Sequence, residues 1–169
     1  MTELKNLKLG DVKSPTLNSD EYLEKYEEKV KEKFESYVPN SEIIDKIRQL
    51  LNNNHQALEI IVIGADWCPD CTNNIPSMIK IAKTLGNKLL NIRILYGVMV
   101  NAMRRPGDPL WHSKKSPPEA LDPKFKLEKL PTFYIFDKNE NLIGRIIEKP
   151  KQNSTLEKDL LEILELNFN

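Results

Sequence analysis

The sequence lacks the features that mark a membrane or secreted protein, and it has little cysteine. Its longest apolar run, residues 60–65, falls far short of the roughly 20 residues that a membrane-spanning helix needs. The N-terminal residues are polar and charged, without the apolar segment of a secretory signal, which predicts a cytoplasmic protein. The only two cysteines, Cys68 and Cys71, are too close in sequence to constrain much chain. Reactivity therefore explains them better than a structural disulfide framework does.

The sequence also has no excess charge of either sign. It contains 25 Lys and Arg against 25 Asp and Glu, so neither a nucleic acid nor an anionic membrane is expected as a partner. With 40% hydrophobic and 30% charged residues, the 169-residue chain has the composition of one globular domain plus an extension. We divide it into residues 1–40, an N-terminal arm with an amphipathic helix, and residues 41–169, a domain with a long irregular insertion at about 97–129.

The N-terminal part is predicted to be helical after a loose arm of 18 residues. Apolar and aromatic residues recur every three or four positions from residue 18 to residue 37, which predicts a single helix. That helix either packs on the domain or docks a partner. After Pro39, either Asn40 or Ser41 can cap a second helix that runs to about Leu51.

The rest of the sequence predicts an α/β domain. A continuous Ile- and Val-rich run is followed by a helical pattern that Gly86 closes and then by a second apolar run. This order predicts two parallel strands joined by a helix. Six prolines and glycines between residues 106 and 123 prevent a long helix in the segment 97–129, although a short one fits at 119–127. A strand hairpin and a C-terminal helix with a capping box at 154–157 follow. These elements span about 58–64, 68–85, 90–96, 132–136, 142–147 and 156–164.

The spacing of the two cysteines predicts redox chemistry. In a helix that begins at about Cys68, residues three apart lie on one face, so Cys68 and Cys71 can form and break a disulfide. Cys68 would lie at the helix N-terminus, where free N–H groups and the helix dipole favour a thiolate. Trp67 and Pro69 would form an apolar rim for substrate, although Trp67 can also merely shield the helix start. Asp70 would oppose thiolate formation, or is an ordinary loop residue.

The motif Trp67-Cys68-Pro69-Asp70-Cys71, with Pro76 after it and Leu130-Pro131-Thr132 opening a later strand, resembles the thioredoxin superfamily. The resemblance covers about residues 41–169 and implies a three-layer α/β/α fold with a central mixed sheet, β-α-β followed by a β-hairpin and a helix. It implies that Cys68 and Cys71 are catalytic and that Leu130 and Pro131 bind substrate, Pro131 as a cis-proline.

The same resemblance implies a kink at Pro76 and a glycine in the last strand, here Gly144. It implies no cofactor; the partners would be protein or small-molecule disulfides and a reductase or dithiol that donates electrons. The WCPDC form is similar to a subgroup of cytosolic thioredoxin-related proteins that reduce small or selected disulfides.

Two departures from this family predict a narrower choice of substrate. Val62 stands where thioredoxins have a buried aspartate that accepts a proton from the second cysteine. The insertion at 97–129 also makes the chain longer than a minimal thioredoxin. Within it, Arg104 and Arg105 would recognise a carboxylate-bearing disulfide, or else they are solvated. In that second case Met99, Met103 and Trp111 seal the edge of the sheet.

The alternatives to redox catalysis fall into two classes, a metal or haem site and a binding module. A zinc site is not indicated, because the only histidines, His55 and His112, lie far from the cysteines in sequence and form no short-spaced pair. Covalent haem attachment needs a histidine where Thr72 stands. The second class, a non-enzymatic thioredoxin-like binding module, would use the cysteines as a redox switch. Turnover separates it from an enzyme, since a switch reacts once.

Overall fold

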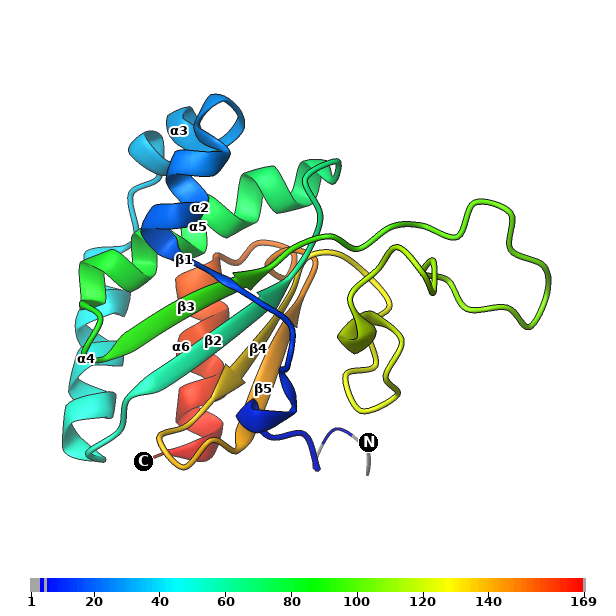
Figure 1. Ribbon diagram of the computed structural model, residues 1–169. Coiled ribbons are helices and arrows are strands. Elements are labelled where there is room, and N and C mark those ends of the chain that lie inside the picture. Colours follow the sequence, from blue (N-terminus) through cyan, green and yellow to red (C-terminus); the bar gives the residue numbers. More distant parts are fainter. Residues whose placement is uncertain (1–3, 5, 169) are drawn as a thin grey trace.

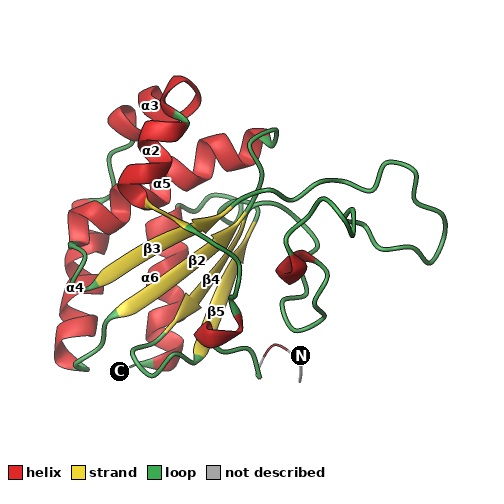
Figure 2. Cartoon of the chain, viewed as in Figure 1, coloured by secondary structure: helices red, strands yellow, loops and turns green. Residues whose placement is uncertain are grey.

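A five-stranded mixed sheet forms the centre of the computed structural model, which describes residue 4 and residues 6–168 (Figure 1, Figure 2). The strand order is β1-β3-β2-β4-β5. The predicted α/β class with a central mixed sheet is therefore confirmed. The strands are β1 (Leu17–Asn18), β2 (Leu58–Ile63), β3 (Leu90–Leu95), β4 (Thr132–Phe136) and β5 (Leu142–Ile147). The helices are η1 (Leu9–Asp11), α2 (Ser19–Lys25), α3 (Glu27–Ser36), α4 (Ser41–Asn53), α5 (Pro69–Leu85), η2 (Pro118–Ala120) and α6 (Leu156–Asn167).

The two predicted supersecondary units are both present. Strands β2 and β3 are parallel and are joined by α5, whereas β4 pairs antiparallel with both β2 and β5. Parallel strands place their carboxyl ends at the same edge of a sheet. The chain leaving β2 at Gly64 therefore lies beside the chain leaving β3 at Tyr96, and Gly64 N–H donates to the Leu95 carbonyl at 3.0 Å.

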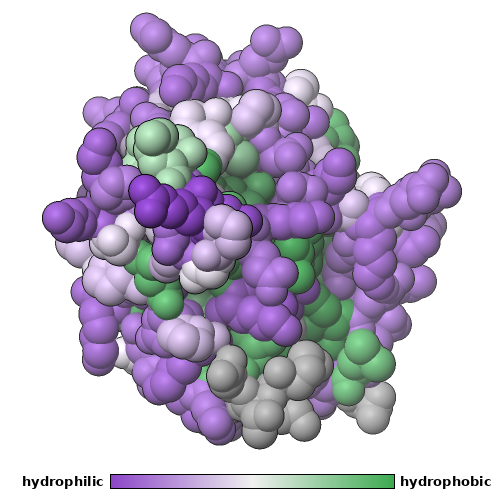
Figure 3. Space-filling view, turned by 90° about the vertical axis from the view of Figure 1, so that its right-hand side faces the viewer, coloured by the Kyte–Doolittle hydropathy of each residue, from purple (hydrophilic) through white to green (hydrophobic). Residues whose placement is uncertain are grey.

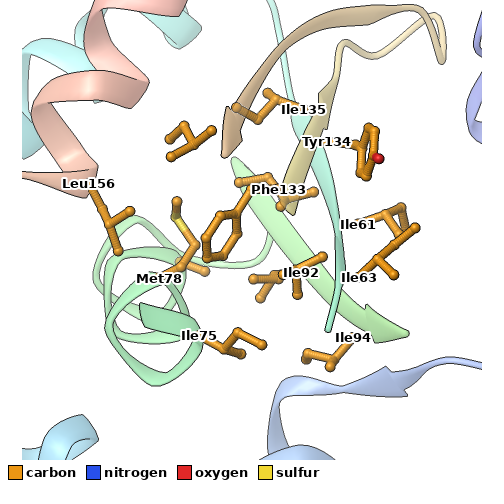
Figure 4. Close-up of a cluster of buried hydrophobic side chains, with 14 of the residues drawn as sticks. Ile61, Ile63, Ile75, Met78, Ile92, Ile94, Phe133, Tyr134, Ile135 and Leu156 are labelled. Atoms are coloured by element: carbon orange, nitrogen blue, oxygen red, sulfur yellow. The ribbon is translucent and has the colours of Figure 1, made fainter. Parts of the chain in front are cut away.

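The main core lies between the sheet and the helices α4, α5 and α6. Figure 1 shows α6 behind the strands. Successive residues of a strand point to opposite faces. Figure 4 accordingly shows Phe133, Ile92 and Ile94 directed toward Met78 of α5, while Tyr134 points to the other side of the sheet. The side chains of this cluster are almost completely buried.

The opposite face of the sheet is covered by irregular chain rather than by α-helices. The N-terminal segment runs across it in Figure 1. Phe125 of the insertion contacts β4. The Tyr134 hydroxyl donates to the Phe125 carbonyl at 2.7 Å, and the two rings meet edge to face. Buried Leu7, Phe125 and Leu127 supply apolar surface to the core cluster there.

Local signals fix several element boundaries where the sequence predicted them. Asn40 caps α4 by accepting from the Ile43 N–H at 3.2 Å, and Gly86 ends α5 with a φ of 97° that suits glycine. Gly144 lies in β5, where an added Cβ would meet Ile163 of α6 at 2.7 Å. Glycine thus permits the close approach of α6 to the sheet.

Three local predictions were wrong. The helix expected over 18–37 is broken at Tyr26, whose φ of −110° and ψ of 25° end α2 and begin α3. The capping box at 154–157 is absent, since Thr155 caps α6 and the Glu157 carboxylate instead accepts from Tyr37 and from the Asn40 N–H. The short helix at 119–127 is only the three-residue turn η2.

The N-terminal arm is attached to the rest of the chain. Strand β1 pairs antiparallel with β3, and the Lys13 and Ser14 N–H groups donate to buried Glu119 at 2.7 and 2.9 Å. The division at residue 40 stays a prediction. Among the described residues, no helix is long and apolar enough to span a bilayer.

Candidate active site

The two cysteines lie at the N-terminus of α5, at the carboxyl edge of the parallel strands. Cys68 is the N-cap of this helix, and its Sγ accepts a hydrogen bond from the Cys71 N–H at 3.3 Å. Pro69 occupies the first helical position, where the N–H that proline lacks would have no partner within the helix. Both thiols are free. The predicted placement of the two sulfurs on one helical turn is thus present.

The two sulfurs differ in exposure and in surroundings. Cys68 is 6% exposed and its thiol donates to the Leu130 carbonyl at 3.6 Å, while Cys71 is completely buried. Burial raises the pKa of the Cys71 thiol, and the hydrogen bond with Cys68 adds to this. The Asp70 charge acts in the same direction to a smaller extent. Cys71 is therefore held as a neutral thiol.

Gly64 leaves room for the buried sulfur. A Cβ built at this position would lie 2.8 Å from Cys71 Sγ and 3.0 Å from Cε1 of Tyr96. Such contacts are well inside van der Waals distance. The residue that follows β2 must therefore be a glycine for Cys71 and the Tyr96 ring to occupy their positions.

A cluster of three tyrosines, Tyr22, Tyr26 and Tyr96, packs next to this sulfur. Their ring centroids lie 5.1 to 5.2 Å apart. The Tyr22 and Tyr96 hydroxyls form a hydrogen bond of 2.6 Å, and Tyr22 is completely buried. Burial raises the pKa of both hydroxyls. Tyr22 and Tyr96 thus hold α2 beside the end of β3 through neutral hydroxyls that are bonded to each other.

The remaining predicted site residues surround Cys68. Trp67 is 44% exposed, and its Nε1–H donates to the Val98 carbonyl at 2.9 Å. Pro69 is exposed and Asp70 is half-buried. Leu130 is buried with its carbonyl at the Cys68 sulfur, and the Leu130–Pro131 peptide bond is cis, as the resemblance implies.

Sequence reasoning missed the contribution of Gly64, Tyr96 and Tyr22 to this site. The first two follow directly after β2 and β3, and their proximity could have been found from the rule that parallel strands end at the same edge. No sequence signal placed Tyr22 of the N-terminal helix there. Among residue 4 and residues 6–168, no three His, Cys, Asp or Glu side chains are grouped to hold a metal ion.

Comparisons with known proteins agree with this fold. The sequence model of a family described as thioredoxin matches residues 16–96, a range that includes both cysteines. A search of curated proteins finds no match. An HIV epitope scaffold is similar in structure with a TM-score of 0.65 and 16% identity, over 94% of this chain and 98% of the scaffold. A protein of unknown function from Pseudomonas aeruginosa is similar with a TM-score of 0.64 and 16% identity, over 95% and 99% of the two chains. The chain therefore has a thioredoxin-like α/β fold, and its residues 16–96 resemble the thioredoxin family.

Proposed function

We propose that this protein is a dithiol–disulfide oxidoreductase that reduces disulfides through Cys68 and Cys71. The observation that carries the proposal is the hydrogen bond of 3.3 Å from the Cys71 N–H to Cys68 Sγ at the start of α5. A sulfur in this position meets unpaired backbone N–H groups and the positive end of the helix dipole, and both stabilise the negative charge of a thiolate.

The first step is attack by the Cys68 thiolate on one sulfur of a substrate disulfide. A mixed disulfide forms, and the other substrate sulfur leaves as a thiolate that takes a proton. Cys68 is the attacking residue in this proposal because it is the more exposed of the pair, at 6% against 0% for Cys71. The partly exposed Trp67 and Pro69 offer apolar surface to the substrate, and Leu130 and Pro131 flank the sulfur.

The second step is attack by Cys71 on the Cys68 sulfur. Cys71 loses its proton, the Cys68–Cys71 disulfide forms, and the second substrate sulfur leaves as a thiol. The raised pKa of Cys71 means that this proton is held until the mixed disulfide has formed. The departing substrate thiolate is a suitable acceptor for it, since Val62 is apolar and provides no carboxylate. A dithiol or a reductase must then return the pair to the reduced form.

Turnover tests the proposal. The purified protein is supplied with a protein disulfide and an excess of dithiothreitol, and the uncatalysed rate is subtracted. We expect many equivalents of disulfide to be reduced per molecule, and no turnover by Cys68→Ser. Reduction of a single equivalent by the wild-type chain would instead identify a redox switch, the alternative function of this fold, and activity retained in Cys68→Ser would overturn the proposal.

A further inference from the structure

The insertion begins and ends at the cysteine site. Its first residues contact the active-site turn, where Val98 accepts from Trp67 Nε1–H at 2.9 Å and donates to the Gly64 carbonyl at 3.4 Å. Its last residues lead into Leu130, whose carbonyl lies 3.6 Å from Cys68 Sγ. The two ends of the insertion are therefore anchored at the rim of the reactive sulfur.

Residues 99–116 form an irregular arm that projects from this rim as a loop, seen at the right of Figure 1. Val100 and Trp111 pair in an antiparallel bridge, and Asn101 N–H donates to the Leu110 carbonyl at 2.9 Å. Trp111 is buried, and its Nε1–H donates to the Leu127 carbonyl at 2.8 Å. The base of the arm is thus fixed. The tip lies four or five residues beyond the bridge, a reach of up to about 15 Å.

The arm carries an excess of positive charge. It contains four basic residues and one acidic residue, Asp108, whose carboxylate accepts from the Arg105 N–H at 2.9 Å. None of the four basic side chains forms a salt bridge with a described residue. The basic residues are Arg104, Arg105, Lys114 and Lys115.

Exposed apolar side chains accompany this charge on the arm and at the active-site rim. Met99, Val100 and Met103 are 40%, 43% and 88% exposed, and Trp67 continues the series to the edge of the site. Figure 3 views the molecule from the side on which the arm projects, and small apolar areas interrupt its mainly hydrophilic surface. Apolar contacts flanked by charge are typical of a surface that binds a polypeptide.

We propose that the 99–116 arm binds an acidic polypeptide segment of the disulfide substrate and delivers the adjacent disulfide to Cys68. This inference rests on the proposed function and names the substrate class of the same site. The free basic side chains are complementary to Asp and Glu on the partner. A contact with both the tip and Cys68 must also span the part of the arm beyond the bridge, a length that corresponds to about four or five extended residues and favours a polypeptide over a small-molecule disulfide.

Two peptides, each with the same intramolecular disulfide, test this inference. One carries four Glu and the other four Lys, placed four to seven residues from the nearer cysteine. Each is mixed with the reduced wild-type chain in a single turnover without a regenerating reductant, and the bimolecular rate of peptide thiol release is measured. At low ionic strength we expect the acidic peptide to react about tenfold faster, and salt near 1 M to remove the difference.

Charge reversal supplies the matched variants. Arg104→Glu with Arg105→Glu should invert the preference, whereas Lys88→Glu with Lys138→Glu makes the same change in net charge at the opposite end of the strands and should preserve it. Equal rates for the two peptides, or equal effects of the two double variants, would overturn the inference while leaving the proposed function intact. Reduction of neither peptide would instead contradict the proposed function.

Two small disulfides test whether the charge preference requires a substrate long enough to reach the tip of the arm. Dithiodiglycolate carries two negative charges and cystamine carries two positive ones, but neither spans the arm. We expect their rates to respond to the Arg104 and Arg105 reversals less than twofold. If the charge reversals change the rates of the small disulfides as much as those of the peptides, long-range electrostatic attraction alone explains the preference. That result would overturn the assignment to a polypeptide substrate.

Discussion

Replacing Gly64 with alanine tests whether the buried sulfur and the tyrosine cluster share one tightly filled space. The new methyl group would lie 2.8 Å from Cys71 Sγ and 3.0 Å from the Tyr96 ring. Gly64 does not have a left-handed φ, so the substitution adds volume without backbone strain. The neighbours can yield only by moving a completely buried thiol or a ring fixed by the hydrogen bond to Tyr22.

The size of the effect follows from two opposing contributions. Overpacking a filled core costs about 1–3 kcal/mol. The loss of freedom of the unfolded chain on replacing glycine by alanine returns about 0.4–1 kcal/mol. We therefore expect a net loss of about 1–2 kcal/mol in the free energy of unfolding. With a urea m-value of about 2 kcal/mol per M, the unfolding midpoint should fall by about 0.5–1 M.

The assay is urea unfolding of the reduced protein, followed by circular dichroism. Gly10→Ala is the matched control, because no atom lies within 4 Å of a Cβ at that position. The control should leave the midpoint unchanged or raise it slightly. If Gly64→Ala is as stable as Gly10→Ala, the close packing of Gly64, Cys71 and Tyr96 is refuted.

Three further substitutions have defined outcomes. Glu119→Gln should destabilise the protein by about 1–2 kcal/mol at pH 7. Burial opposes the Glu119 charge, but the hydrogen bonds from the N-terminal arm outweigh it and lower the pKa in the folded state. The stabilisation is thus present above the unfolded pKa of 4.5 and disappears as the pH falls through the folded pKa. If Glu119→Gln lowers the free energy of urea unfolding equally at pH 7 and pH 3, this account is contradicted. Tyr22→Phe should cost about 1–2 kcal/mol in thermal unfolding, because it leaves the Tyr96 hydroxyl without its partner; an unchanged melting temperature would argue against the bond. Trp67→Phe loses the hydrogen bond to Val98 and should slow the reduction of peptide disulfides while leaving the free energy of unfolding nearly unchanged. A lower free energy of unfolding with an unchanged rate would indicate a structural role.

Elements with local signals were predictable from the sequence. The α5 helix could be placed because Pro69 suits the first helical position and Gly86 the position after the last turn, and both preferences depend on neighbouring residues alone. The parallel pair and the hairpin followed from the change of hydrophobic period and from the handedness of the crossover. The cysteine pair was predictable for the same reason, since its geometry needs only one helical turn.

Features that depend on tertiary contacts were not predictable. The apolar steps through Tyr22 and Tyr26 continue without interruption, so nothing in the pattern shows that α2 and α3 separate where these rings turn toward Tyr96. Glu157 matched a capping box, but its carboxylate instead accepts hydrogen bonds from the Asn40 N–H and the Tyr37 hydroxyl, 117 and 120 residues away. Long-range partners of this kind override local preferences and leave no sequence signal.

Mass spectrometry of trapped intermediates tests most directly whether Cys68 attacks the substrate and Cys71 resolves the mixed disulfide. Reduced Cys71→Ser and Cys68→Ser variants are mixed separately with a disulfide peptide, quenched with acid and digested. We predict that Cys71→Ser accumulates one equivalent of peptide bound to Cys68, and that Cys68→Ser, whose remaining thiol is buried with a raised pKa, accumulates almost none. Equal trapping by the two variants, or trapping on Cys71 alone, would contradict the assignment of Cys68 as the attacking thiol.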